Sequence, residues 1–112
     1  MRDVGAAEAF YGTIARHTGL RPGRRWESGV QFRGAWATFS LVDDDAPVTD
    51  NLHIAFPAPD QQTVRDFHAA ATAAGYRSNG EPGERPRYGP GYYAAYVFDP
   101  DGANIEAVYR PS

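Results

Sequence analysis

The stretch NLHIAF, residues 51–56, alternates apolar and polar side chains with the two-residue period of a strand. Leu52, Ile54 and Phe56 would share one face of such a strand, and that face suits a protein core. His53 would then lie on the opposite face. The alternation alone predicts a half-buried strand, and it favours a simple role for the histidine as a polar residue lining a hydrated groove.

Two other stretches have the 3.6-residue apolar period of helices. The first runs from about residue 4 to 17, with Asp3 as its N-cap and Gly19 after its end. The second follows the N-cap Asp60, carries apolar residues at every third or fourth position, and ends at Gly75. These capping residues predict where each of the two helices begins and ends.

Short runs rich in aromatic and β-branched residues predict strands elsewhere. GRRWES, VQFRG and WATFSLV follow the first helix, and YYAAYVFDPDGANIEAVYR closes the chain as two strands joined by a turn at DPDG. Between the second helix and this pair, SNGEPGERPRYGPG is expected to be a long loop. The segment DDDAPVTD, residues 43–50, is expected to be a solvated acidic linker.

The two halves of the chain resemble each other. AFYGTIARHTGLRPG and DFHAAATAAGYRSNG align with a single-residue gap, and about three strands follow each helix. This predicts one domain built from two modules, residues 1–45 and 51–112. Only Met1 and Arg2 precede the first cap, so the strand that NLHIAF forms in the second module is expected to be missing from the first. A start codon placed too far downstream would explain the gap.

Composition excludes several classes of protein. With 112 residues, 42% of them hydrophobic, and a formal charge of −3, the chain suits one soluble cytoplasmic domain. No run of Lys or Arg suggests a nucleic-acid partner, and no apolar run is long enough to cross a membrane. The absence of cysteine excludes disulfides and Cys-ligated zinc.

Glu106 is a carboxylate within the apolar run NIEAV. By alternation it shares a face with Asn104 and Val108. A buried carboxylate without a partner is costly, so Glu106 needs a hydrogen-bonding partner, water or a metal ion, unless the strand is an edge that faces solvent.

The second half of the chain resembles the vicinal oxygen chelate superfamily, which includes glyoxalases, bleomycin-resistance proteins and extradiol dioxygenases. The resemblance rests on LHIAF, VRDFHAAATAAG and GEPGERPRYGPGYYAAYVFDPDGANIEAV, within residues 52–108. It implies an α+β fold of two βαβββ modules that form a curved, partly open, barrel-like sheet around a cavity. Here the first module would lack its first strand.

The resemblance also implies a metal site. Its usual ligands lie on the first and last strands of each module, which correspond here to His53 and Glu106, and Glu106 would also serve as a catalytic base. WATFSLV, the expected last strand of module one, contains no Asp, Glu or His. Two ligands suit a weakly held divalent ion, Fe, Mn, Zn or Ni, acting as a Lewis acid.

The expected function is that of a metal-dependent lyase, isomerase or oxygenase acting on a small oxygenated molecule, resembling lactoylglutathione lyase or a dioxygenase. The alternative is a metal-free protein that binds or sequesters a small molecule, as bleomycin-resistance proteins do. Arg85, Tyr88 and Tyr92 would border the cavity and bind the ligand, although solvent-exposed arginines and packed tyrosines would also explain them. The resemblance and the unpaired sheet edge imply a homodimer.

Overall fold

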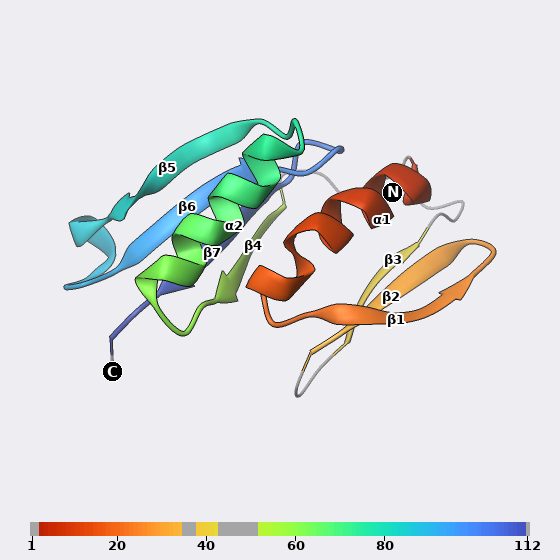
Figure 1. Cartoon of the computed structure of the whole chain (residues 1–112), viewed down its shortest axis with the longest axis horizontal. Coiled ribbons are helices and arrows are strands. Elements are labelled where there is room, and N and C mark those ends of the chain that lie inside the picture. The colour runs from red at the N-terminus through yellow and green to blue at the C-terminus, as the bar shows by residue number, and fades with distance from the viewer. Residues whose placement is uncertain (1–2, 35–37, 43–51, 112) are drawn as a thin grey trace.

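Two sheets and two α-helices make up the part of the chain that a computed structural model describes, residues 3–34, 38–42 and 52–111 (Figure 1). The α+β class is therefore confirmed. The elements are α1 (Val4–Ile14), the 3-10 turn η1 (Ala15–His17), β1 (Arg21–Trp26), β2 (Gly29–Arg33), β3 (Thr38–Val42), β4 (His53–Pro57), α2 (Gln61–Ala73), β5 (Ser78–Glu84), the 3-10 turn η2 (Pro86–Tyr88), β6 (Tyr93–Phe98) and β7 (Asn104–Tyr109).

The strands form two separate sheets and no closed barrel within the described residues. One is antiparallel in the order β1-β2-β3, and the other has the order β4-β7-β6-β5, with β4 parallel to β7. Strand β3 pairs with β2 along one edge, and along its other edge it pairs with no strand of the described residues. The predicted linker at 43–50 lies outside the described residues. So do Met1 and Arg2, on which the expectation of a missing first strand rests.

Both helices begin at the predicted caps. The Asp3 carboxylate accepts a hydrogen bond from the Ala6 amide at 3.0 Å, and the Asp60 carboxylate accepts one from the Thr63 amide at 2.7 Å. Helix α2 ends where Gly75 adopts a positive φ of 96°. The Tyr76 amide then donates to the Ala71 carbonyl at 3.1 Å, which is the Schellman pattern that the sequence predicts.

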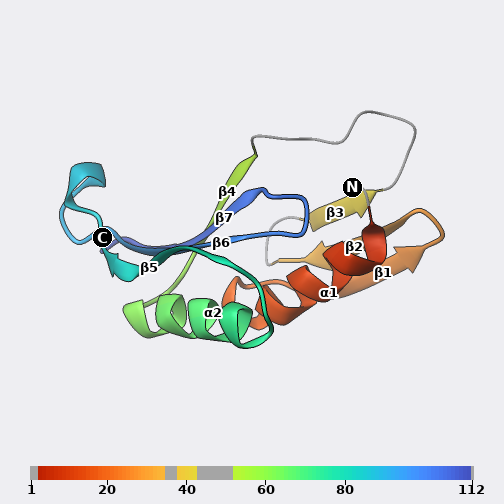
Figure 2. The same cartoon turned by 90° about the horizontal axis from the view of Figure 1, so that it is seen from above.

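The two helices lie side by side on one side of the molecule, and α2 covers one face of the four-stranded sheet (Figures 1 and 2). Helix α1 packs against β2 and β3, and α2 packs against β5, β6 and β7. A single apolar cluster joins the two halves, with Phe10 and Ile14 from α1, Phe67 from α2, and Val97 and Ile105 from the large sheet. None of the helices in the described part is long and apolar enough to cross a membrane.

One predicted element is wrong. Residues 78–84, expected to belong to a loop, form strand β5 at the edge of the four-stranded sheet. Glycine and proline weaken a central strand, but an edge strand tolerates them because its outer side needs no partner. The pairing of β5 with β6 is irregular, with register shifts on both sides of Gly80. The turn predicted at DPDG is confirmed, because the Gly102 amide donates to the Asp99 carbonyl at 2.9 Å.

Candidate functional site

The face of the four-stranded sheet opposite its core face carries the polar residues that the sequence singled out. In β4, Ile54 and Phe56 pack against the core, and His53 is exposed on the other face, as the alternation predicts. Strand β7 follows the same rule, with Ile105 in the core and Glu106 on the opposite face. Glu106 lies beside Ala55 in β4 and opposite Tyr96 in β6.

Glu106, His53 and Tyr92 form one hydrogen-bonded group. The Oε1 atom of Glu106 lies 2.7 Å from Nε2 of His53, and its Oε2 atom accepts a hydrogen bond of 2.5 Å from the Tyr92 hydroxyl. The Glu106 side chain is only 1% exposed, whereas that of His53 is 52% exposed. The structure thus brings together three of the five predicted site residues, and it gives the buried carboxylate the partners that its burial requires.

The direction of the hydrogen bonds in this group follows from the protonation state of its members. When the Glu106 carboxylate is ionised it only accepts hydrogen bonds, so Nε2 of His53 then carries the hydrogen, and Nδ1 of a neutral ring keeps its lone pair. Burial, together with the hydrogen bond to Glu106 and the charge of that residue, raises the pKa of Tyr92. Tyr92 therefore stays protonated and remains a donor to Glu106 at neutral pH.

A pocket of about 310 Å³ opens beside this group. Arg85 and Tyr88, two of the predicted ligand-binding residues, line it together with His53. Tyr92 and Glu106 are not among the lining residues, and they reach the pocket through hydrogen bonds, from Tyr92 to Glu106 and between Glu106 and His53. The remaining lining residues are Asn79, Gly80, Arg87, Tyr96 and Asn104.

Sequence reasoning assigned no binding role to Asn79, Tyr96 and Asn104, although all three line the pocket. Asn104 was placed correctly on the face of Glu106 by alternation. Tyr96 reaches the site because it pairs with Glu106 across β6 and β7. The sequence carries no local signal for that register, or for the pairing that brings Asn79 within 3.0 Å of Asn104.

The donor set does not by itself fit a metal ion. In the described residues, no group of three or more His, Cys, Asp or Glu side chains could hold one. Among the described residues that line the pocket, His53 is the one side chain of these types, and each oxygen of its partner Glu106 already accepts a hydrogen bond. A tetrahedral or octahedral site needs four to six ligands, so most would have to come from solvent, substrate or residues outside the described ranges.

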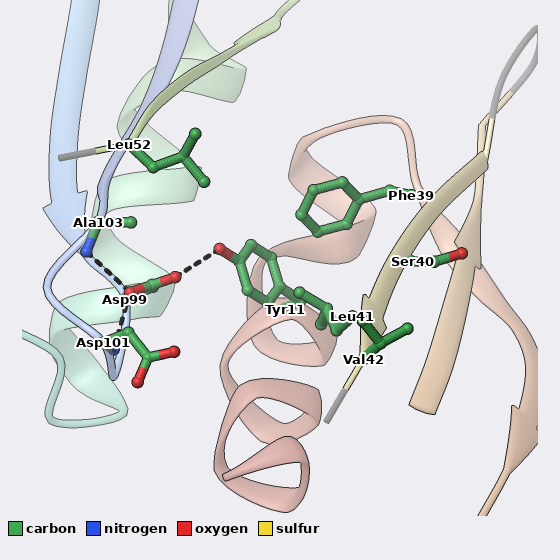
Figure 3. A pocket seen from close by; sticks show the side chains of 9 residues that line it. All are labelled: Tyr11, Phe39, Ser40, Leu41, Val42, Leu52, Asp99, Asp101 and Ala103. Carbon is green, nitrogen blue, oxygen red and sulfur yellow. Dashed lines mark hydrogen bonds between the residues drawn. The ribbon is translucent and has the colours of Figure 1, made fainter. Parts of the chain in front are cut away.

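A second, smaller pocket of about 150 Å³ lies between α1, β3 and the β6–β7 turn (Figure 3). Its polar contact is the hydrogen bond of 2.7 Å that the Tyr11 hydroxyl donates to Asp99, which also accepts from the Asp101 and Ala103 amides (Figure 3). Burial and the neighbouring Asp99 carboxylate raise the pKa of Tyr11. Asp99 thus ties the turn to helix α1, which is a structural role.

Comparisons with known proteins agree with this fold. No family model matches the chain. The chain is 25% identical to YqjT, an uncharacterised protein of Bacillus subtilis (strain 168), over 115 residues that cover 95% of this chain and 90% of that protein. Among solved structures, it is 29% identical to a glyoxalase/bleomycin resistance protein from Albidiferax ferrireducens T118, with a TM-score of 0.79, covering 97% of this chain and 91% of that one.

Two further structures show the same fold at lower identity. A lactoylglutathione lyase from Agrobacterium tumefaciens is 23% identical, with a TM-score of 0.72 and coverage of 96% of this chain and 86% of that one. A glyoxalase/bleomycin resistance protein/dioxygenase family enzyme from Burkholderia phytofirmans PsJN is 17% identical, with a TM-score of 0.74 and coverage of 97% and 91%. The fold and these likenesses support the resemblance of the chain to the vicinal oxygen chelate superfamily.

Proposed function

We propose that the protein binds a small oxygenated molecule in the pocket beside His53 and transfers a proton to or from it. The observation that carries this proposal is the hydrogen bond of 2.7 Å between His53 and the buried Glu106 at the wall of that pocket. A histidine oriented by a buried carboxylate is a recurrent arrangement for general acid–base catalysis. Structural neighbours that include a lactoylglutathione lyase support a lyase or isomerase reaction.

In this proposal His53 is the catalytic residue, because it lines the pocket, and Glu106 positions it. Nδ1 of a neutral His53 would take a proton from an acidic C–H or O–H group of the ligand. The imidazolium so formed is stabilised by the Glu106 carboxylate, which in turn is held by Tyr92. Return of the proton to a neighbouring atom of the ligand completes an isomerisation, and departure of a leaving group completes a lyase reaction.

Deuterium exchange tests this proposal without requiring the natural substrate. The protein would be incubated in D2O with pyruvate, hydroxyacetone and dihydroxyacetone, and incorporation of deuterium next to the carbonyl would be followed by NMR. We expect exchange above the buffer rate with at least one of them, and a loss of about 100-fold or more in His53→Gln and in Glu106→Gln. His17→Gln, which removes a histidine outside the pocket, serves as the matched control.

The outcome separates catalysis from plain binding. Exchange that is equally fast in His53→Gln and in the unmodified protein would contradict the proposed role of His53. Saturable binding of these compounds without exchange would instead support the alternative, a metal-free protein that sequesters its ligand. The two arginines and two tyrosines that line the pocket also suit ligand binding.

A second candidate is the metal-dependent form of this function, as a lyase, isomerase or oxygenase. Its support is the type of the two donors, because imidazole and carboxylate groups suit Fe, Mn, Zn and Ni. Metal binding would require the hydrogen bond between His53 and Glu106 to give way, and further ligands would come from substrate, solvent or residues outside the described ranges. Metal content would be measured after purification with Fe, Mn, Zn and Ni in the medium. Stoichiometric metal that falls in both His53→Ala and Glu106→Ala supports the assignment, and metal unaffected by either substitution contradicts it.

We also propose that the protein forms a homodimer. In the described residues β3 pairs only with β2, and an unpaired strand edge tends to recruit a second chain. Light scattering coupled to size-exclusion chromatography should then give twice the 12.3 kDa mass of the chain at micromolar concentration. A mass of one chain at several hundred micromolar would contradict the proposal.

A further inference from the structure

We propose that the ligand of this pocket is a small carboxylate, recognised by the guanidinium groups of Arg85 and Arg87. The inference rests on the proposed function for the choice of pocket, and it adds the chemical class of the ligand. It is carried by the way in which the two arginines are held, by the absence of carboxylate partners for them in the described residues, and by the nature of the other pocket walls.

Arg85 is held rigidly. Its Nη2 atom donates to the Glu81 carbonyl at 2.7 Å and its Nη1 atom to the Glu84 carbonyl at 3.3 Å. The guanidinium carbon also lies 5.4 Å from the centre of the Tyr96 ring. These contacts fix the cation without neutralising it, because its partners are neutral carbonyl groups and an aromatic face.

Two glycines leave the space that this guanidinium fills. A Cβ atom at Gly80 would lie 2.7 Å from Cδ1 of Tyr96 and 3.3 Å from Nη2 of Arg85. A Cβ atom at Gly83 would lie 3.1 Å from Nη1 of Arg85. A side chain at either position would therefore crowd the Arg85 guanidinium, and at Gly80 it would also clash with the Tyr96 ring.

Arg87 supplies a second cation, with its guanidinium carbon 4.8 Å from the centre of the Tyr88 ring. In the described part of the chain, no carboxylate forms an ion pair with Arg85 or Arg87. The neighbouring Glu81 side chain is 83% exposed, and its carboxylate lies near His68 instead, at 3.9 Å. The pocket thus contains two cations without an acidic partner, beside a histidine whose own carboxylate is buried behind it.

This arrangement suits a carboxylate better than a neutral ligand. A guanidinium group presents parallel N–H donors that match the two oxygens of a carboxylate. Tyr88 and Tyr96 line the pocket beside the arginines that stack on their rings, and the amides of Asn79 and Asn104 can bind a further oxygen atom. A carboxylate held at the arginines would leave an adjacent carbonyl or hydroxyl group free to reach His53.

The test is a titration with paired probes. Benzoate and pyruvate would be titrated against benzamide, which has the size of benzoate but no charge, and against inorganic phosphate. Binding would be followed by NMR and by calorimetry at fixed ionic strength. We expect both carboxylates to bind in the millimolar range or tighter, benzamide to bind at least about 10-fold more weakly, and Arg85→Gln to weaken carboxylate binding by roughly 10- to 100-fold.

Two further variants make the test specific. Arg77→Gln removes an arginine that stacks on Phe98, 4.5 Å from its ring centre, outside the pocket, so it should leave binding unchanged. Gly83→Ala keeps Arg85 but displaces it, and should weaken carboxylate binding at least about 3-fold, whereas Gly12→Ala, where a Cβ atom meets nothing within 4 Å, should not.

Three results would overturn the inference: benzamide binding as tightly as benzoate, carboxylate affinity unchanged in Arg85→Gln, or phosphate binding more tightly than either carboxylate. These failures are distinct from failure of the proposed function. If carboxylates bind through Arg85 and no proton exchange depends on His53, only the proposed function fails. If His53-dependent exchange occurs with neutral hydroxyacetone and no carboxylate binds, only this inference fails.

Discussion

Glu106 is a buried carboxylate whose two oxygen atoms are each bound by a different donor. The sequence alone predicts that Glu106 needs a partner, because it is a carboxylate within an apolar strand. The identity of one partner, His53, followed from the resemblance, which placed both residues in one site. The expected contact of Tyr92 with the ligand stays a prediction; in the structure its hydroxyl donates to Glu106, and it is not among the residues that line the pocket.

Removing the Tyr92 hydroxyl should therefore reduce stability. In Tyr92→Phe, one oxygen of a buried carboxylate loses a donor, so we expect the free energy of unfolding to fall by roughly 1 to 3 kcal/mol in urea denaturation. Tyr88→Phe is the control, because Tyr88 is 54% exposed and its hydroxyl makes no hydrogen bond within the described residues. Equal stability losses in the two variants would show that the hydrogen bond to Glu106 contributes little.

Tyr11 should make stability depend on pH in the alkaline range. Burial and the Asp99 carboxylate raise the pKa of Tyr11 in the folded protein above its ordinary value of 10.0. The folded state therefore keeps a proton that the unfolded chain loses. This contribution to stability is complete below about pH 10 and is lost progressively as the pH rises further. Urea denaturation between pH 8 and 11 should show a steeper decline for the unmodified protein than for Tyr11→Phe, and parallel declines would contradict this account.

At the scale of elements, the β6–β7 turn depends on one side chain. The Asp99 carboxylate accepts hydrogen bonds from the Tyr11 hydroxyl and from the Asp101 and Ala103 amides. We expect Asp99→Ala to cost about 2 to 4 kcal/mol of unfolding free energy, because a buried acceptor for three donors is lost.

A double-mutant cycle would isolate the contact between the turn and α1. Because Asp99 and Tyr11 are hydrogen-bonded, the combined effect of Asp99→Ala and Tyr11→Phe should be smaller than the sum of the single effects, by about 1 kcal/mol or more. Strictly additive effects would mean that the Tyr11–Asp99 contact does not stabilise the fold.

The helices and most strands were predictable because their signals are local. Caps at Asp3 and Asp60, a glycine at the end of α2, and two-residue alternation in β4 and β7 all act within a few residues. Strand β5 was missed because an edge position, which only the assembled sheet reveals, allows glycine and proline in a strand. The parts of the site that depend on β5 and on cross-strand register were missed with it.

At the scale of the whole molecule, one core serves both sheets. The apolar cluster contains residues of α1 and β2 as well as residues of α2, β6 and β7. The ring of Phe39 in β3 lies 5.9 Å from that of Phe56 in β4, so the two sheets also touch through aromatic side chains. The residues before and after the predicted linker at 43–50 therefore share one hydrophobic interior.

This shared core predicts a single unfolding transition. Differential scanning calorimetry should give a calorimetric enthalpy close to the van't Hoff enthalpy, because neither half can keep its part of the cluster when the other unfolds. Two separate transitions, or a van't Hoff enthalpy far below the calorimetric value, would instead show that the modules unfold independently.

The most direct test of the central claim, that the pocket on the four-stranded sheet is the functional site, is an amide chemical-shift titration of the ¹⁵N-labelled protein with pyruvate. The account predicts saturable shifts concentrated at Gly80, Tyr96 and Asn104, which line that pocket. Saturable shifts concentrated instead at Phe39 and Leu41, which line the smaller pocket beside α1, would contradict it.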